Sequence, residues 1–158
     1  MTQTIPTDLP WPRTVIVIHP RERRSKCSVE PLRGNSDYLF TTFPNPVPID
    51  LSNYVQLGIG GPILSADDND KGLLLLDGTW KRAAQMLPFY SHVPVRSLPP
   101  VRTAYPRKSE IFEDPEDGLA TIEALFAALK QLNRPTTGLL DQYYWKSRFL
   151  ELNGWNDQ

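Results

Sequence analysis

Unbroken apolar runs in the first half of the chain predict buried strands. Residues 14–18 are all β-branched, and residues 73–76 are four consecutive leucines. Runs of this length without alternation are typical of parallel strands that are covered on both faces. Residues 55–59 and 93–98 are weaker strand candidates, because glycines or prolines interrupt or closely follow them.

Apolar residues recur at helical spacing in the second half of the chain. Residues 119–132 follow this spacing after a candidate cap at Asp117, so they predict an amphipathic helix. A shorter helix is expected from a Thr79 cap to about residue 87, and a last one over residues 138–153. Residues 102–118 show little periodicity and are interpreted as a long loop. Strands followed by helices predict a layered α/β fold.

The length and charge of the chain limit its organisation. The chain has 158 residues, of which 40% are hydrophobic, which suffices for one core but not for two. We expect a flexible N-terminal segment over residues 1–13 and a single domain over residues 14–158. The formal net charge is −1, from 17 basic and 18 acidic residues. Any contact with nucleic acid must therefore be a local patch.

The cysteine and hydrophobic content indicate where the protein works. The single cysteine, Cys27, cannot form an internal disulfide, and with only two histidines a metal site is not expected. The N-terminus lacks the apolar run of a signal peptide. The longest aliphatic run is far shorter than the roughly 20 residues needed to cross a bilayer. We therefore expect a cytoplasmic protein that has no membrane span.

The most informative segment joins the four-leucine strand to the helix after it. The strand delivers the carboxylate of Asp77 to its C-terminal end, where ligands bind in open parallel sheets. Gly78 lets another backbone or a ligand come close, and Trp80 is the first residue of the predicted helix after the Thr79 cap. The alternative is that Asp77 caps the helix and Trp80 fills the core, since caps and buried aromatics are common.

A basic loop follows the first strand, over residues 19–32. Its cations are candidates for holding RNA phosphates, because arginine can bind phosphate through two parallel hydrogen bonds. They are Arg21, Arg23, Arg24 and Lys26. The alternative is a solvated loop, because Glu22 and Glu30 lie among the cations.

Two later segments carry weaker signals. Thr121 and Glu123 lie at the start of an otherwise apolar helix, whose first turn offers free N–H groups to a ligand. The alternative is that Glu123 has a purely structural role, because the positive N-terminal end of a helix stabilises a carboxylate. Residues 143–153 interleave aromatics with cations, which suits either base stacking or an amphipathic core helix, and the second is favoured.

Together these motifs resemble one superfamily over about residues 14–153. His-Pro-x-Glu after the first strand, Asp-Gly-Thr-Trp at residues 77–80 and Thr-x-Glu-Ala at residues 121–124 resemble the DTW-domain proteins. Those proteins include tRNA-uridine aminocarboxypropyltransferases. Residues 139–153 are similar to the related enzymes that modify a pseudouridine in small-subunit ribosomal RNA.

The resemblance implies a SPOUT-like fold, with a parallel sheet flanked by helices and a deep trefoil knot. It implies transfer of the 3-amino-3-carboxypropyl group from S-adenosylmethionine to a uridine-type base in tRNA or rRNA, with methylthioadenosine released. Members of this superfamily are monomers or homodimers. Two rival functions are a SPOUT-type methyltransferase and a non-catalytic RNA-binding or ribosome-assembly factor.

The resemblance also implies roles for individual residues. Asp77 and Trp80 match the catalytic positions that contact the amino acid end of the cofactor. Further expected cofactor contacts are Ser28 in the first loop, Val101 at the adenine, and Thr121 with its neighbour Glu123 on the cofactor-side helix. As further RNA-binding residues we expect Arg107 and Lys108, in the long loop.

Overall fold

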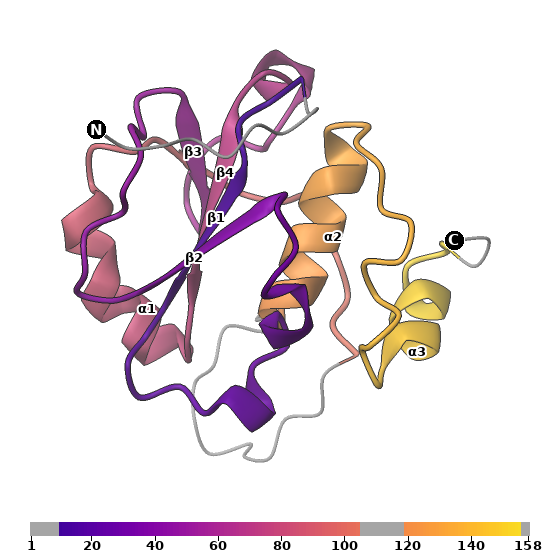
Figure 1. The fold of residues 1–158 in the computed structure, drawn as a ribbon. Helices are drawn as coiled ribbons and strands as arrows, with labels where there is room; N and C mark the ends of the chain where they lie inside the picture. The colour runs from indigo at the N-terminus through magenta and orange to yellow at the C-terminus, as the bar shows by residue number, and fades with distance from the viewer. Residues whose placement is uncertain (1–9, 105–118, 156–158) are drawn as a thin grey trace.

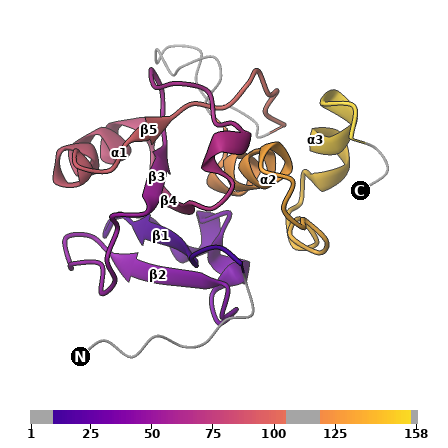
Figure 2. The ribbon, with the colours of Figure 1, turned by 90° about the horizontal axis from the view of Figure 1, so that it is seen from above.

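One parallel sheet forms the centre of the molecule. The computed structural model describes residues 10–104 and 119–155, and within them five strands are ordered β2-β1-β4-β3-β5 (Figures 1 and 2). The strands are β1 (Thr14–Ile18), β2 (Tyr38–Thr42), β3 (Tyr54–Leu57), β4 (Gly72–Asp77) and β5 (Val95–Arg96). All four pairings are parallel, so the predicted α/β fold with a parallel sheet is confirmed.

The central pair, β1 and β4, is built from the two strongest apolar runs. Every residue of β1 is buried, as expected of a strand that is covered on both faces. The weaker candidates form shorter strands than predicted, β3 and the two-residue β5. The sequence did not predict β2, an edge strand whose residues are mostly half-buried and which therefore lacks a continuous apolar signature.

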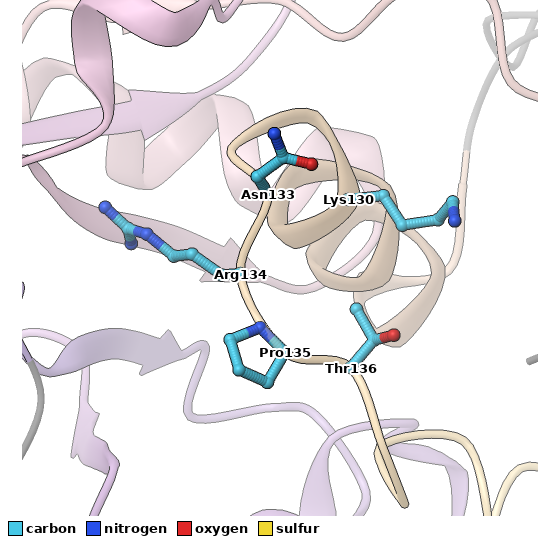
Figure 3. Close-up of a pocket in the computed structure, with 5 residues that line it drawn as sticks. All are labelled: Lys130, Asn133, Arg134, Pro135 and Thr136. Carbon is cyan, nitrogen blue, oxygen red and sulfur yellow. The ribbon is translucent and has the colours of Figure 1, made fainter.

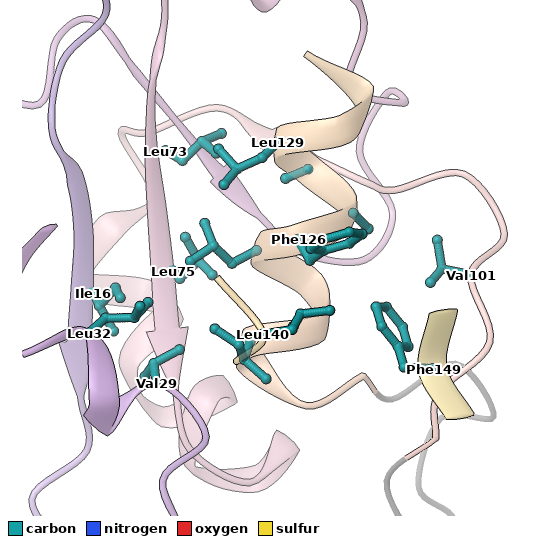
Figure 4. Packing of buried hydrophobic residues seen from close by; sticks show 14 of the residues in the cluster. Ile16, Val29, Leu32, Leu73, Leu75, Val101, Phe126, Leu129, Leu140 and Phe149 are labelled. Carbon is teal, nitrogen blue, oxygen red and sulfur yellow. The ribbon is translucent and has the colours of Figure 1, made fainter. Parts of the chain in front are cut away.

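Helices cover both faces of the sheet. They are α1 (Trp80–Met86), α2 (Thr121–Gln131) and α3 (Lys146–Leu152). Figure 1 shows α1 and α2 on opposite sides of the sheet, with α3 outside α2. Alternate residues of the strands feed two cores. Ile16, Leu73 and Leu75 face α2 (Figure 4), whereas Val17 and Leu74 pack with Met86 of α1.

The helix boundaries confirm one prediction and correct another. Thr79 caps α1 as expected, its hydroxyl accepting a hydrogen bond from the Arg82 N–H at 3.3 Å. The last helix is shorter than predicted, because residues 138–145 lie mostly in turns, in which Gly138 has a φ of +79°. For α2, the residue before the first turn is Ala120, and the cap candidate Asp117 lies outside the described residues.

Short 3₁₀ helices and the residues that precede β1 complete the described chain. The 3₁₀ helices are η1 (Arg24–Lys26), η2 (Glu30–Leu32), η3 (Ala66–Asp68) and η4 (Leu87–Tyr90). The Trp11 ring lies 4.5 Å from the Arg134 guanidinium, and Arg13 donates to the carbonyls of Ser36 and Tyr38. The domain boundary at residue 13 and the trefoil knot stay predictions. Within those ranges, no helix has the length and apolar character needed to span a bilayer.

Candidate active site

The carboxyl ends of β1 and β4 form a topological switch point. The connection that leaves β1 packs on the α2 face of the sheet, through Cys27, Val29 and Leu32. The connection that leaves β4 forms α1 and packs on the opposite face, through Met86. Where neighbouring parallel strands send their connections to opposite faces, a crevice opens at their carboxyl ends, and ligands of open α/β sheets bind there.

Asp77 ends β4 at this point, and its side chain is 5% exposed. One carboxylate oxygen accepts a hydrogen bond from the Thr121 hydroxyl at 2.5 Å, and the other accepts one from the Cys27 thiol at 3.1 Å. Asp77 therefore does not cap α1, which is the task of Thr79. Three chain segments distant in sequence meet at this carboxylate.

Burial governs the protonation of this cluster. It raises the pKa of Asp77, and the hydrogen bonds from Thr121 and Cys27 oppose that rise only in part. Burial and the nearby Asp77 charge raise the pKa of Cys27 to about 12. At neutral pH Cys27 is therefore a thiol that donates to Asp77, and it is not a thiolate nucleophile.

The charges around Asp77 leave it without a cationic partner among the described residues. Its hydrogen-bond donors, the Thr121 hydroxyl and the Cys27 thiol, are both neutral, and the charges that act on its pKa are those of Glu22 and Glu30, which raise it further. A cation placed beside Asp77 would offset the repulsion from these two glutamates and favour the ionised carboxylate. The site therefore suits a positively charged ligand group, such as an ammonium or a sulfonium.

Ser28 docks the first loop on α2. Its hydroxyl oxygen accepts a hydrogen bond from the Ile122 N–H at 3.0 Å, in the first turn of the helix. This N–H has no partner within the helix, because it belongs to the first turn. Ser28 therefore caps α2 from a distant segment and brings the first loop beside Thr121.

Glu123 connects the loops around the site. Its side chain is fully buried, and it accepts hydrogen bonds from the Thr103 hydroxyl at 2.6 Å and the Ala104 N–H at 2.8 Å. It also accepts from the Ala120 N–H at 2.9 Å and from the Tyr143 hydroxyl at 3.0 Å. Four donors match the roughly four lone-pair positions of a carboxylate, so this side chain organises the segments that surround α2.

Val101 and Trp80 are the other two residues that were expected at the site. Val101 is 7% exposed and lies in the core near Phe149, as Figure 4 shows. Trp80 is the first residue of α1, directly after the cap. The structure thus brings Ser28, Asp77 and Thr121 into one cluster, while Val101 and Glu123 support it from the core. Their contacts with a cofactor stay predictions.

The expected RNA-binding cations lie beside the cluster. Arg21, Arg23 and Arg24 are exposed in the loop that follows β1, and Lys26 ends η1. Arg24 lies 3.8 Å from the Glu30 carboxylate, an exposed and weak pair, which leaves its guanidinium accessible. Arg107 and Lys108 lie outside the described residues.

His19 fixes the start of the same loop. Its Nδ1 accepts a hydrogen bond from the Arg21 N–H at 3.2 Å, so the ring proton is on Nε2, which donates to the Gln85 side chain at 3.0 Å. An ion pair between Glu22 and Arg82 at 3.1 Å ties the loop to α1 again. Sequence reasoning missed these contacts, although His-Pro-x-Glu had marked the segment.

A pocket of about 140 Å³ opens at the carboxyl ends of β1 and β2, next to the cluster. We call it the strand-end pocket. It shares Cys27 with the Asp77 cluster and is otherwise lined by Ile18, His19, Pro20, Glu22, Arg24, Glu30, Arg33 and Thr42. Thr42 was not predicted as a pocket residue, because β2 itself was not predicted.

A larger hollow of about 340 Å³ lies at the far end of α2 (Figure 3). Figure 3 shows Arg134 pointing away from Lys130 and Thr136. The Arg134 guanidinium instead donates to the carbonyls of Asn69 and Lys71 at 3.0 and 2.6 Å. This hollow contains no member of the Asp77 cluster, so we assign the candidate site to the strand ends. In the described residues, no three His, Cys, Asp or Glu side chains gather as they would around a metal ion.

Comparisons with known proteins support the fold and the family. A search of curated proteins finds no match. Among solved structures, the fold is similar to the S-adenosylmethionine-dependent rRNA:acp-transferase Tsr3 from Vulcanisaeta distributa, with a TM-score of 0.65 and 23% sequence identity. The match covers 90% of this chain and 79% of that chain. The family model for the DTW domain matches residues 2–147, nearly the whole sequence. The chain therefore belongs to the DTW domain family.

Proposed function

We propose that this protein transfers the 3-amino-3-carboxypropyl group of S-adenosylmethionine to a uridine-type base in tRNA or rRNA, releasing methylthioadenosine. The observation that carries the proposal is the buried carboxylate of Asp77, at the switch point of a DTW-family domain and without a cationic partner among the described residues. The fold similarity to an rRNA:acp-transferase agrees with it, but fold alone does not fix function.

The electrostatics of Asp77 fit the amino acid end of this cofactor. When bound, S-adenosylmethionine supplies a carbon made electrophilic by the adjacent sulfonium. Asp77 would hold the ammonium group, and the favourable Coulomb energy would offset the cost of keeping the carboxylate ionised in a buried position. Thr121 and Cys27 orient the carboxylate through their hydrogen bonds.

Positioning decides which carbon is attacked, and the residues around Asp77 set that position. Trp80 would restrict the amino acid chain sterically from the start of α1, and Ser28 and Thr121 would border the rest of the cofactor. The alternative role for Asp77 is that of a general base for the uracil ring nitrogen, for which its raised pKa would suit it if another group held the ammonium. Arg21, Arg23 and Arg24 would hold RNA phosphates at the rim.

The proposal is tested by incubating the protein with total RNA and carboxyl-labelled S-adenosylmethionine. We expect label in RNA and methylthioadenosine as the spent cofactor. Label should be lost in Asp77→Asn and Trp80→Ala variants that retain wild-type circular dichroism. An exposed carboxylate in α3 provides the matched control, and Glu151→Gln should keep full activity.

The rival functions give different results in the same experiment. S-adenosylhomocysteine without labelled RNA would indicate methyl transfer. RNA binding with no heat of S-adenosylmethionine binding in calorimetry would indicate a non-catalytic RNA-binding factor. Full activity in both the Asp77→Asn and Trp80→Ala variants would show that the site is assigned to the wrong residues.

A further inference from the structure

The strand-end pocket has the volume of one six-membered ring. Its volume of about 140 Å³ is close to the roughly 150 Å³ of a protein cavity that takes up benzene. A pyrimidine base is a single ring of this kind, whereas a purine has a second, fused ring. The pocket therefore has room for a pyrimidine, whereas a purine would have to leave part of its second ring outside it.

The lining of this pocket is polar, with acceptors and donors side by side. The Glu30 carboxylate lies 2.9 Å from the Arg33 guanidinium and 3.8 Å from that of Arg24. Guanidinium groups are donors only, so Arg24 and Arg33 can both serve the carbonyl groups of a uracil ring. Enzymes that modify bases read an extruded base through such edge contacts.

An aromatic row leads from this pocket to the surface. His19 lines the pocket, and its ring is nearly parallel to that of Phe43, with the centroids 6.4 Å apart. Phe43 contacts Phe89 edge to face at 4.8 Å, and Phe89 is 62% exposed. The exposed Phe89 ring, which the Phe43 ring separates from the pocket residue His19, is a surface on which a neighbouring base can stack.

We propose that the strand-end pocket receives the pyrimidine to be modified, turned out of its RNA strand, while Phe89 stacks an adjacent base. The inference rests on the proposed function and names its acceptor site. Because the pocket shares Cys27 with the Asp77 cluster, a base bound there lies next to the residues that would hold the cofactor. The rival occupant is the amino acid end of the cofactor, whose ammonium and carboxylate could also meet Glu30 and Arg33.

The first test measures base preference without the cofactor. Fluorescence anisotropy compares labelled oligonucleotides of about eight uridines and about eight adenosines, a length within one binding site. We expect the uridine oligonucleotide to bind at least about tenfold more tightly, as a ring that enters a fitted, polar pocket should. A Thr42→Phe variant fills the pocket from the exposed end of β2, and it should lose this preference.

The matched control is Thr137→Phe, the same substitution at an exposed site in the turn after α2. It should keep the preference of the wild type. An Arg33→Gln variant leaves the pocket open and removes one guanidinium, so it should weaken binding of uridine more than that of adenosine. The inference is wrong if the wild type shows no preference for uridine, or if Thr42→Phe retains it.

Calorimetry with S-adenosylmethionine on the same variants separates this inference from the proposed function. We expect Thr42→Phe to bind the cofactor like the wild type. If Thr42→Phe abolishes cofactor binding and leaves the uridine preference intact, the pocket holds the cofactor and the inference is overturned. If the wild type binds no cofactor but Thr42→Phe removes a uridine preference, the pocket assignment stands and the proposed transferase activity fails.

Discussion

Replacing Glu123 by glutamine should destabilise the protein more than its conservative chemistry suggests. One carboxylate oxygen accepts from the Thr103 hydroxyl and the Ala120 N–H. The other accepts from the Ala104 N–H and the Tyr143 hydroxyl. An amide has only one oxygen, so in either orientation its NH₂ group faces one of these pairs of donors. In each pair the hydroxyl can rotate to accept from the amide, but the backbone N–H cannot.

The magnitude follows from the donors that Glu123→Gln leaves behind. One buried backbone N–H loses its acceptor, at a cost of about 1–3 kcal/mol. The two remaining hydrogen bonds lose the assistance of a charge, which removes roughly 1 kcal/mol from each. Burying a neutral amide in place of a charge offsets part of this loss. We expect a net destabilisation of about 3 kcal/mol, or a fall in Tm of roughly 6–12 °C for a domain of this size.

Urea denaturation followed by circular dichroism measures this change as a shift of the midpoint at constant slope. The control is Glu151→Gln on the exposed face of α3, which should stay within about 0.5 kcal/mol of the wild type. Tyr143→Phe removes one of the four donors and should fall between the two variants. A loss below about 0.5 kcal/mol for Glu123→Gln would refute the view that this carboxylate holds the surrounding segments together.

Three further predictions concern the Asp77 cluster. Ser28→Ala removes the acceptor for the Ile122 N–H and should cost about 1 kcal/mol in urea denaturation, with the exposed Ser25→Ala as a control that changes little. Because burial raises the folded-state pKa of Asp77, the unfolding free energy of the wild type should fall relative to that of Asp77→Asn as pH rises above about 4; a pH-independent difference in urea denaturation would contradict this. With its pKa at about 12, the Cys27 thiol should react with iodoacetamide at pH 8 far more slowly in the folded protein than in urea. The reason is that folding lowers the fraction of Cys27 present as thiolate on the order of a thousandfold. Equal rates in the two states would show that the thiol is neither buried nor hydrogen-bonded.

The fold was predictable where burial leaves a strong pattern in the sequence. The runs that form β1 and β4 are apolar on both faces and too short for a typical helix, so a buried strand suits them, and the cap at Thr79 follows from its residue type. The edge strand β2 is mostly half-buried, so its composition does not separate it from a loop. The turns at residues 138–145 carry aromatic and aliphatic residues that also fit a helix, so their composition does not separate the two.

The candidate site was predictable only in part, because hydrogen-bond partners distant in sequence leave no local signal. The order of the motifs identified Ser28, Asp77 and Thr121, and the structure brings these three together. The thiol of Cys27 had been considered only as a metal ligand or disulfide partner, and it is instead a donor to Asp77. Helix position accounts for one of the four donors to Glu123, the N–H of Ala120, whereas the other three come from outside α2.

The arrangement around Asp77 also explains why this site is built from neutral donors. A buried aspartate with an arginine partner would be ionised and satisfied, and a cationic ligand would then gain little by approaching it. Hydroxyl and thiol donors orient the Asp77 carboxylate without neutralising it, so its charge remains available. If this reasoning holds, binding of S-adenosylmethionine lowers the pKa of Asp77 and releases a proton at pH values below its raised pKa. Introducing a lysine at Cys27 should therefore abolish cofactor binding while stabilising the ionised form of Asp77, because the lysine ammonium would take the place of the ligand's cation.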